Sequence, residues 1–313
     1  MTHARRLPIL LDDPNIQTVT LALNYVCNSR CSFCFIEPEL GMKIPDTDED
    51  RIASVFRENR ERRRYRRLIL AGAEATLRND LPTIAARALS EGGFEVVRLQ
   101  TNGRRLKDKG YAAELVQAGI GEFFVSVHAG SADLDRVLTR NPNSFAEMRA
   151  GLENLRSLPT RLISNTCVSQ SNVHALDQLA TFLIQQEVPE CHFWGFIEFG
   201  DIGQAQEHVA FSRSVPATLG AARRLQAEQR KVVLSWFPRC MLEELANTLV
   251  DHRDDTLIHE SFATRAKQHG GFSCPHQNSC ASFGDNCMGL HERHVELIGD
   301  ERQHLTPFSS TLE

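Results

Sequence analysis

The sequence lacks an apolar run of about 18 residues, the length that a membrane-spanning helix needs. We also expect no secretory leader, because the start, MTHARRLPILLDDPN, reaches aspartates and a proline after a few apolar residues. Internal repeats and low-complexity segments are missing as well. We therefore expect a cytoplasmic protein with no membrane partner.

An excess of positive charge is absent too. Lys and Arg number 35 and Asp and Glu number 40, which gives a net charge of -5. A polyanion binder gains affinity by neutralising phosphates, so we expect no nucleic-acid partner. Hydrophobic residues make up 42% and charged residues 24%, as in an ordinary globular protein. The 313 residues suffice for two domains, or for one barrel-sized domain with an extension.

Short β-rich segments alternate with longer helical segments over the first two thirds of the chain. Strands are predicted at 17–24, 67–71, 95–100, 122–127, 160–168 and 191–199, and helices at 48–60, 80–90, 108–118, 144–157 and 173–186. Such alternation predicts parallel strands joined by right-handed crossovers. The expected fold class is α/β, a partial (βα)6 TIM-like barrel.

The composition changes after Gly203. Residues 216–231 predict a helix and 231–237 a strand, but the rest is rich in His, Cys, Gly and Asp with weak periodicity. Such a tail buries little apolar surface, so we expect a metal to organise it. The sequence thus predicts an N-terminal segment (1–16), a core barrel (17–212) and a small irregular cysteine-rich C-terminal extension (213–313).

Nine cysteines, an odd number in a chain expected to stay in a reducing compartment, indicate metal ligation or thiol chemistry more than disulfides. Cys167 and Cys191 stand alone. The others form two groups: Cys27, Cys31 and Cys34 near the N-terminus, and Cys240, Cys274, Cys280 and Cys287 near the C-terminus.

The first group reads CxxxCxxC and directly follows the first predicted strand, at the barrel end where such enzymes place their chemistry. Three thiolates can hold three irons of a 4Fe-4S cluster and leave the fourth iron open to a substrate or cofactor. A zinc ion is the alternative, but zinc takes four ligands and this loop offers no obvious fourth.

This loop resembles that of the radical S-adenosylmethionine superfamily, which shows an aromatic residue, here Phe33, before the last cysteine. The resemblance implies that Phe33 contacts the cofactor. The segment RLILAGAEATL is similar to the family's second strand and its GGEPTL motif. The resemblance implies that Gly72, Ala73 and Glu74 line the methionine amino group of the cofactor. Two departures are Ala73, in place of the second glycine, and Ala75, in place of proline.

Later strand ends also match the family. The matching positions are Asn102 in TNG, Ser126 and His128 in SVH, Asn165 in SNTCV and the turn at 200–203. The resemblance implies that these residues contact the cofactor, with Ser126 and His128 at a strand end that contacts its ribose. It covers roughly residues 17–205. It implies one-electron cleavage of S-adenosyl-L-methionine to methionine and a 5'-deoxyadenosyl radical, which abstracts hydrogen.

The C-terminal cysteines resemble the family's auxiliary-cluster extensions of the SPASM and Twitch types, which end in C-x-G. The resemblance implies a second 4Fe-4S cluster held by Cys240, Cys274, Cys280 and Cys287. The spacing departs from these extensions, which often carry CxxC where Cys274 and Cys280 lie farther apart. A structural zinc is the competing interpretation, although zinc cannot carry electrons. Three nearby histidines, His276, His291 and His294, are candidates to replace one of these ligands, but we interpret each as a surface residue.

Two further features have open interpretations. The run 57–67 holds seven arginines, which form a solvated helix face or a docking patch for an acidic electron donor; binding of phosphate or RNA is a third interpretation. Cys167 has the same strand parity as Asn165, so both side chains are expected to face the barrel interior. Cys167 is either a buried inert thiol or a catalytic hydrogen-atom donor.

The sequence therefore predicts an enzyme that abstracts hydrogen from a small polar metabolite. A sugar or aminocyclitol natural-product intermediate is the example, with oxidation or epimerisation as the outcome. About 16 residues precede the first predicted strand, too few for a separate leader-peptide-binding domain. Modification of a ribosomally made peptide is the close alternative, and a non-catalytic zinc-binding protein is the distant one. The expected electron donor is a flavodoxin- or ferredoxin-type protein.

Overall fold

A computed structural model of the chain describes residues 5–6, 17–36, 41–198, 204–250, 254–266 and 271–308. It forms two compact units. Unit 1 comprises residues within 1–127, 135–164 and 253–264, and unit 2 comprises residues within 128–134, 165–252 and 265–313. The predicted turn at 200–203 lies outside the described residues, as does most of the N-terminal segment.

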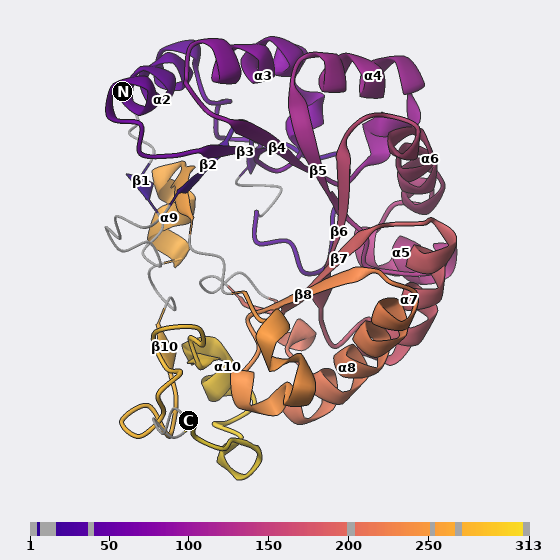
Figure 1. Ribbon diagram of the computed structural model, residues 1–313, viewed down its shortest axis with the longest axis vertical. Coiled ribbons are helices and arrows are strands. Elements are labelled where there is room, and N and C mark those ends of the chain that lie inside the picture. The colour runs from indigo at the N-terminus through magenta and orange to yellow at the C-terminus, as the bar shows by residue number, and fades with distance from the viewer. Residues whose placement is uncertain are drawn as a thin grey trace. The chain divides into compact units, whose positions relative to one another are not determined.

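Unit 1 is built on a sheet with the strand order β1-β9-β2-β3-β4-β5-β6 (Figure 1). The strands are β1 (Arg5–Arg6), β2 (Thr18–Ala22), β3 (Arg67–Ala71), β4 (Val96–Thr101), β5 (Ile120–Ser126), β6 (Arg161–Val168) and β9 (Asp255–Ile258). Strands β9, β2, β3, β4 and β5 pair in parallel, and β1 is antiparallel to β9. The last four residues of β6 belong to unit 2.

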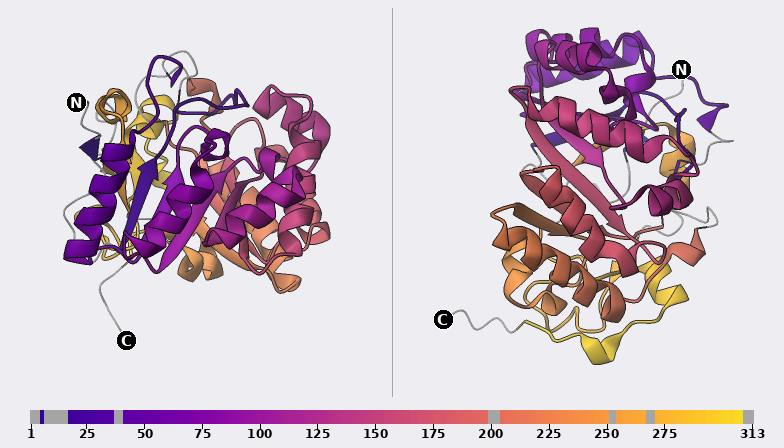
Figure 2. Two further views of the ribbon diagram at one scale, coloured as in Figure 1. Left: turned by 90° about the horizontal axis from the view of Figure 1, so that it is seen from above. Right: turned by 90° about the vertical axis from the view of Figure 1, so that its right-hand side faces the viewer.

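Helices follow the strands of unit 1 in sequence; the earlier ones lie along the outer side of its sheet, and the last lies on the inner side, below β2 in Figure 1 (Figures 1 and 2). They are α2 (Glu49–Arg62), α3 (Leu81–Ser90), α4 (Lys109–Gln117), α5 (Ala132–Thr139), α6 (Ser144–Arg156) and α9 (Glu260–Ala266); α5 belongs to unit 1 from Asp135 onwards, and α9 up to Thr264. The side chain of Asp48 caps α2, and that of Asp108 caps α4, by accepting N–H bonds of the first turn. Apolar residues on both sides of the strands are buried, as is typical of a parallel sheet.

Unit 2 continues from β6 with β7 (Glu190–Gly195) and β8 (Lys231–Ser235), and with helices α7 (Leu176–Gln185) and α8 (Phe211–Ala227). Its tail contains the hairpin of β10 (Phe272–Ser273) and β11 (Leu290–His291), followed by α10 (Glu292–Leu297). Short 3-10 turns complete the chain: Ala75–Leu77, Arg104–Lys107, Val173–Ala175, Ala205–Glu207, Arg239–Met241, Glu243–Thr248 and Arg302–His304.

The α/β partial-barrel fold class is confirmed, with differences in single elements. The helix predicted at 216–231 begins at Phe211, five residues before Pro216. The Glu301 carboxylate accepts the N–H groups of Phe211 and Ser212 at 2.7 and 2.9 Å, which satisfies the first turn. Helices α5 and α9 and strand β9 were not predicted. No helix in the described ranges is both long and apolar enough to cross a bilayer.

Candidate functional site

The first cysteine loop begins where β2 ends, and its first residues are hydrogen-bonded to the end of β3 and to the loop that follows β3. The Leu23 N–H donates to the Ala71 carbonyl at 2.8 Å, which extends the β2–β3 pairing by one residue. Asn24 then donates from Nδ2 to the Glu74 carbonyl at 2.7 Å, and its own carbonyl accepts the Ala73 N–H at 3.0 Å. Asn24 thus joins the loop that carries CxxxCxxC to the loop that carries GAEATL.

Gly72 is required by this close approach. Its φ of +144° is one that residues with a side chain rarely adopt. A Cβ at this position would lie 2.5 Å from Asn24 Oδ1 and 2.6 Å from the Asn24 carbonyl oxygen. The backbone conformation and the contact with Asn24 therefore require a glycine at the first position of the GAEATL motif.

The cysteine loop is also held by the end of α5 and the residues after it. The Arg30 N–H donates to the Thr139 carbonyl at 3.0 Å, and the Ser32 N–H donates to the Leu138 carbonyl at 2.9 Å. The buried guanidinium of Arg104 donates to the Asn28 carbonyl and, at 3.2 Å, to Ser29 Oγ. These contacts fix the backbone between the first and second cysteines.

The three thiols are half-buried, and besides this burial the charges of neighbouring thiolates raise the pKa values of Cys27 and Cys31. Burial, followed by the charge of Glu74, raises the pKa of Cys27 to about 11. Burial, followed by the charges of Cys34 and Cys27, raises the pKa of Cys31 well above its ordinary value, and burial raises that of Cys34. Three thiolates placed this close together need positive charge between them, which the irons of a cluster supply.

Two donors point at the sulfur of Cys27. The backbone N–H of Ser29 lies 3.3 Å from Cys27 Sγ, and Nδ2 of Asn102 lies 3.7 Å from it. In the described part of the chain, no three His, Cys, Asp or Glu side chains are arranged around a single metal ion. A cluster distributes three cysteines over three irons, so its ligands do not have to converge on one point. The donor set fits a 4Fe-4S cluster.

The Glu74 carboxylate is buried and fully engaged on one oxygen. Its Oε1 accepts bonds from Thr76 N, Thr76 Oγ1 and Thr101 Oγ1 at 3.1, 2.6 and 2.6 Å. Its Oε2 accepts the Asn102 N–H at 2.7 Å. Glu74 therefore connects the end of β3 to the end of β4. Oε2 accepts fewer bonds than Oε1, so Oε2 is the oxygen for which we predict the contact with the methionine amino group.

Asn102 faces the cysteine loop. Its Nδ2 donates to Asn28 Oδ1 at 2.7 Å in addition to its approach to Cys27, and its Oδ1 accepts the Arg104 N–H at 3.1 Å. The structure thus brings Cys27, Glu74 and Asn102 together. Phe33 is half-buried within the loop, and Ser126 is half-buried at the end of β5; their contacts with the cofactor stay predictions.

Strand β9 and helix α9 support the cysteine loop from the C-terminal part of the sequence. The Tyr25 hydroxyl accepts the His259 N–H at 2.7 Å, and the Tyr25 ring stacks on Phe262 with 5.5 Å between ring centroids. Cys34 and Ala73 pack against the same apolar cluster. No spacing or motif in the sequence predicts that β9 and α9 contact the cysteine loop.

In unit 2, His128 and Cys167 are neighbours. The Cys167 N–H donates to His128 Nδ1 at 3.2 Å, and burial lowers the pKa of His128 to about 4, so the imidazole is neutral at pH 7. Asn172 Nδ2 donates to both residues' carbonyls, at 3.1 and 2.8 Å. Burial, followed by the charge of Glu207, raises the pKa of Cys167 to about 12, so the thiol keeps its hydrogen.

Asn165 precedes Cys167 by two residues on β6 and is buried. Its Oδ1 has no hydrogen-bond partner within the described part of the chain. A buried polar atom without a partner costs free energy, which a ligand atom can recover. This observation supports the predicted role of Asn165 in cofactor binding.

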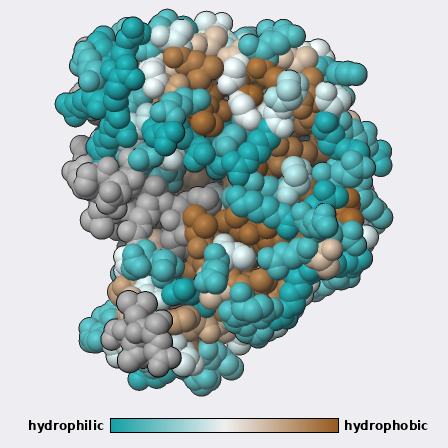
Figure 3. Space-filling model, in the orientation of Figure 1, coloured by the Kyte–Doolittle hydropathy of each residue, from teal (hydrophilic) through white to brown (hydrophobic). Residues whose placement is uncertain are grey.

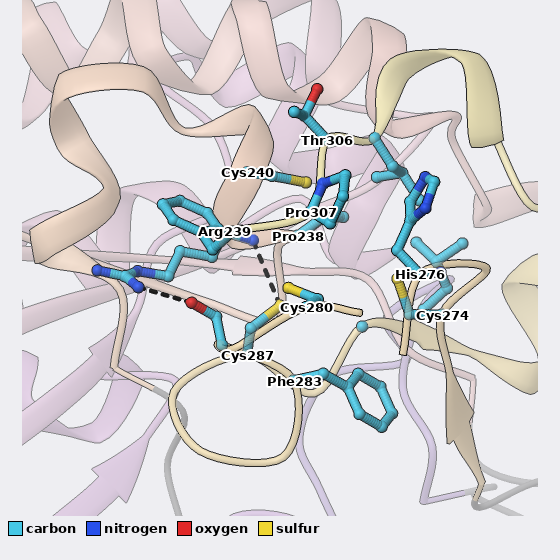
Figure 4. Close-up of a pocket in the computed structure, with 15 residues that line it drawn as sticks. Pro238, Arg239, Cys240, Cys274, His276, Cys280, Phe283, Cys287, Thr306 and Pro307 are labelled. Carbon is cyan, nitrogen blue, oxygen red and sulfur yellow. Dashed lines mark hydrogen bonds between the residues drawn. The ribbon is translucent and has the colours of Figure 1, made fainter. Parts of the chain in front are cut away.

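The four C-terminal cysteines line one pocket of unit 2 (Figure 4). Backbone amides point at three of their sulfurs. The N–H groups of Arg239 and His276 lie 3.4 Å from the sulfurs of Cys287 and Cys274, and a Thr306 backbone hydrogen bond lowers the pKa of Cys240 against the larger opposing effect of burial. The Ser29 amide meets Cys27 in the same way, and such N–H···S bonds stabilise thiolate ligands of clusters.

Gly289 closes the C-x-G pattern of this pocket for a steric reason. Its φ is +82°, and a Cβ there would lie 2.5 Å from the Ser273 carbonyl oxygen and 2.9 Å from the Phe283 ring. Packing in the hairpin of β10 and β11 thus requires a glycine two residues after the last cysteine, Cys287.

The surface interpretation of two histidines was wrong. His291 and His294 are 3% and 2% exposed. His294 Nε2 lies 2.8 Å from Glu301 Oε2, and its ring packs on Phe211, so it contributes to the core of unit 2. His276 is half-buried and lines the cysteine pocket.

Comparison with known families concerns the part of the chain that contains the first loop. The family description "Radical SAM superfamily" matches residues 22–182, just over half of the chain. The chain belongs to the radical SAM superfamily. The matched range contains Cys27, Cys31 and Cys34, so S-adenosylmethionine and a 4Fe-4S cluster are the cofactors expected of this radical SAM enzyme.

Curated relatives share part of the radical SAM chain. A probable GTP 3',8-cyclase of Sulfolobus acidocaldarius is 28% identical over 195 residues, 61% of this chain and 59% of the relative. A probable GTP 3',8-cyclase of Saccharolobus islandicus is 34% identical over 129 residues, 40% of this chain and 39% of the relative. The chain therefore spans less than two thirds of the length of either relative.

Several solved structures share the fold. SuiB of Streptococcus suis bound to its precursor peptide SuiA has a TM-score of 0.57 at 11% identity, over 71% of this chain and 50% of SuiB. anSMEcpe with bound AdoMet and a Kp18Cys peptide has a TM-score of 0.56 at 11% identity, over 69% of this chain and 63% of that protein. Methylornithine synthase (PylB) has a TM-score of 0.52 at 11% identity, over 71% of this chain and 65% of that protein.

Proposed function

We propose that this protein cleaves S-adenosylmethionine reductively and abstracts a hydrogen atom from a small polar metabolite. The observation that carries the proposal is the loop of Cys27, Cys31 and Cys34 at the carboxyl end of β2, held against the GAEATL and TNG loops. Barrel enzymes place their chemistry at this end of the sheet.

The cluster and the cofactor together would supply a one-electron cleavage of the sulfonium and a 5'-deoxyadenosyl radical. The residues of this chain hold and orient the two groups. Ser29 and Asn102 donate to the sulfur of Cys27, which lowers the cost of keeping it as a buried thiolate. Because Gly72 has no side chain, the loop after β3 can approach the backbone of Asn24 closely. Neutral His128 and the unpartnered Asn165 Oδ1 are the polar groups that we assign to the cofactor's ribose.

We further propose that Cys240, Cys274, Cys280 and Cys287 hold an auxiliary 4Fe-4S cluster. The support is their shared pocket and the backbone amides directed at their sulfurs. Amide donors of this kind also occur around zinc-bound thiolates, so metal analysis must separate the two interpretations.

Oxidation is the outcome we propose, with epimerisation as the alternative. Four cysteines complete the ligand set of the C-terminal pocket and leave no free thiol among those that line it. The alternative depends on Cys167, because a protonated thiol can return a hydrogen atom to a carbon radical. Cys167 is then the catalytic residue that decides between the two outcomes.

Two substrate classes deserve testing. The curated relatives are named as cyclases of GTP, a small polar nucleotide, so GTP is the first compound to test. SuiB, which shares the fold, was solved with a precursor peptide, so a ribosomally made peptide is the second class. A flavodoxin- or ferredoxin-type protein is the proposed electron donor.

Metal and product analysis of anaerobically reconstituted protein tests the proposal. We expect about eight irons per chain, and about four after Cys27, Cys31 and Cys34 are replaced together by Ala. Wild-type protein with dithionite should convert S-adenosylmethionine to 5'-deoxyadenosine, whereas the triple variant should not. Cys191→Ala, which lies outside both cysteine groups, should leave the iron content and the product unchanged.

Two results would contradict these proposals separately. Persistent 5'-deoxyadenosine formation in the triple variant would show that the first loop is not the cofactor site. A wild-type content of about four irons together with bound zinc would remove the auxiliary cluster but leave the first site intact.

A further inference from the structure

Arg104 is a buried arginine, and it differs in this from the arginines at the surface of unit 1. Those of the run 57–67 belong to α2, the start of β3 and the residues between them. Hydrophilic residues cover this region, at the upper left of Figure 3, and Arg66 of the run pairs with the exposed Glu95 at 2.6 Å. The run is therefore interpreted as a solvated surface. Arg104 is 7% exposed, and a buried guanidinium is stable only where its donors are paired.

The donors of Arg104 are divided between a carboxylate and the first cysteine loop. Nε and Nη2 each lie 2.7 Å from Glu147 Oε2, and Lys107 Nζ lies 2.5 Å from the other oxygen of Glu147. Nη1 donates to the Asn28 carbonyl and, at 3.2 Å, to Ser29 Oγ. The guanidinium is planar, so its pairing with Glu147 determines the direction in which Nη1 points.

The turn Arg104–Lys107 is itself held by α6, the helix that carries Glu147. A Cβ on Gly151 of α6 would lie 2.4 Å from the Gly103 carbonyl oxygen, so the helix packs directly on the start of the turn. Asn154 of the same helix donates to two carbonyls of the turn at 2.9 Å. Arg104 therefore reaches the cysteine loop from a fixed support.

The Asn28 carbonyl has a second side-chain donor, since Asn141 Nδ2 lies 3.3 Å from it. The peptide bond between Asn28 and Ser29 is trans and planar, so its carbonyl and its N–H point in opposite directions. Arg104 and Asn141 hold the carbonyl. The Ser29 N–H on the opposite side then points at Cys27 Sγ, 3.3 Å away.

We propose that Arg104 and Asn141 are positioning residues that direct the Ser29 amide at the sulfur of Cys27 and thereby raise the reduction potential of the first cluster. The inference rests on the proposed function, because it assumes a cluster at the first cysteine loop. A reduced cluster carries one more negative charge than an oxidised one, so an N–H donor stabilises the reduced form more. Both residues act through the peptide group and not on the sulfur itself.

Two variants remove the donors to this carbonyl one at a time. Arg104→Gln removes the charged donor, and Asn141→Ala removes the neutral one. Lys107→Gln is the control for the first variant, because it changes the net charge equally within the same ion-pair network. Asn143→Ala is the control for the second, because Asn143 precedes α6 and its side chain makes no capping hydrogen bond.

The measurement is an anaerobic redox titration of reconstituted protein, followed by electron paramagnetic resonance. The signal of the first cluster is the one that the triple Ala variant of Cys27, Cys31 and Cys34 lacks. At the wild-type midpoint potential, we expect the ratio of reduced to oxidised first cluster to fall about fivefold in Arg104→Gln and about twofold in Asn141→Ala, because a charged donor forms the stronger hydrogen bond. Both controls should keep the wild-type ratio.

An unchanged ratio in both test variants, or an equal fall in the controls, would overturn the inference. A fall in Arg104→Gln alone would assign the effect to the charge of Arg104 and would also overturn the positioning role. If Arg104→Gln does not bind iron at the first loop, the ratio in Asn141→Ala decides.

The proposed function fails in a different way. If the wild type shows no signal that the triple cysteine variant lacks, the first loop holds no cluster and the proposed function is refuted. The two failures are therefore distinguishable in one set of titrations.

Discussion

Glu74→Gln is the most informative single substitution in the first site, because the change keeps the shape of the side chain and removes one acceptor. In the wild type, both carboxylate oxygens accept bonds, and Glu74 is 1% exposed. The amide oxygen of Gln can replace Oε1, which accepts three bonds. Its NH₂ group would then replace Oε2 and face the Asn102 N–H, a donor, at a position where the wild-type distance is 2.7 Å.

The loss follows from these contacts. A hydrogen bond to a charged group contributes about 1.5–3 kcal/mol, and leaving a buried N–H without an acceptor costs about 1–3 kcal/mol more. We therefore expect Glu74→Gln to lower the free energy of unfolding by about 3 kcal/mol or more. Because Asn102 also approaches Cys27 and Asn28, its displacement should reduce iron uptake at the first loop.

Urea unfolding of protein prepared without iron measures the first effect, and iron analysis after reconstitution measures the second. Glu95→Gln is the control, since Glu95 forms a surface ion pair with Arg66 and should leave both measurements unchanged. A loss of less than about 1 kcal/mol in Glu74→Gln would refute the reasoning, because the Asn102 N–H would then have found another acceptor.

Three further predictions concern unit 2. Burial lowers the pKa of His128 to about 4, below the value of about 6.5 in an unfolded chain, so the free energy of unfolding should fall by about 3 kcal/mol from pH 6.5 to pH 4. This slope should be lost in His128→Gln, and equal slopes would contradict it. Gly289→Ala should reduce iron to about four per chain, whereas Gly284→Ala, at a similar φ but with no atom within 4 Å of the added Cβ, should keep about eight. Turnover in deuterium oxide should leave the product carbon without deuterium; incorporation that Cys167→Ala abolishes would make the enzyme an epimerase.

The strands β2 to β7 could be predicted from the sequence because each combines a short apolar run with a following helical pattern, and β8 could be predicted from its apolar run alone. Their predicted bounds fall within a few residues of the structure; 67–71, for example, coincides with β3. β9 could not be predicted in this way. It has four residues and begins with an aspartate, and its strand conformation depends on pairing with β2 from more than 200 positions away.

For the site, the sequence supplied the residues whose spacing is diagnostic. Both cysteine groups and Gly72 belong to motifs, and the structure gives Gly72 a steric reason. Asn24 and Arg104, which fasten the first loop, are single polar residues with no spacing signal. Their roles emerge from contacts with Glu74 and Asn28, which tertiary structure creates.

The support of the first loop by β9 and α9 has a consequence for synthesis on the ribosome. Tyr25 and His259 are separated by 234 positions, so the loop emerges long before the residues that complete its packing. Until then β2 presents an unpaired edge, and Tyr25 and Ile36 lack the apolar partners Ile258 and Phe262. A nascent chain halted before residue 255 should therefore aggregate or engage chaperones. Stable iron insertion at the first loop should follow the emergence of α9, which makes the cysteines at the start of the chain among the last parts of unit 1 to become functional.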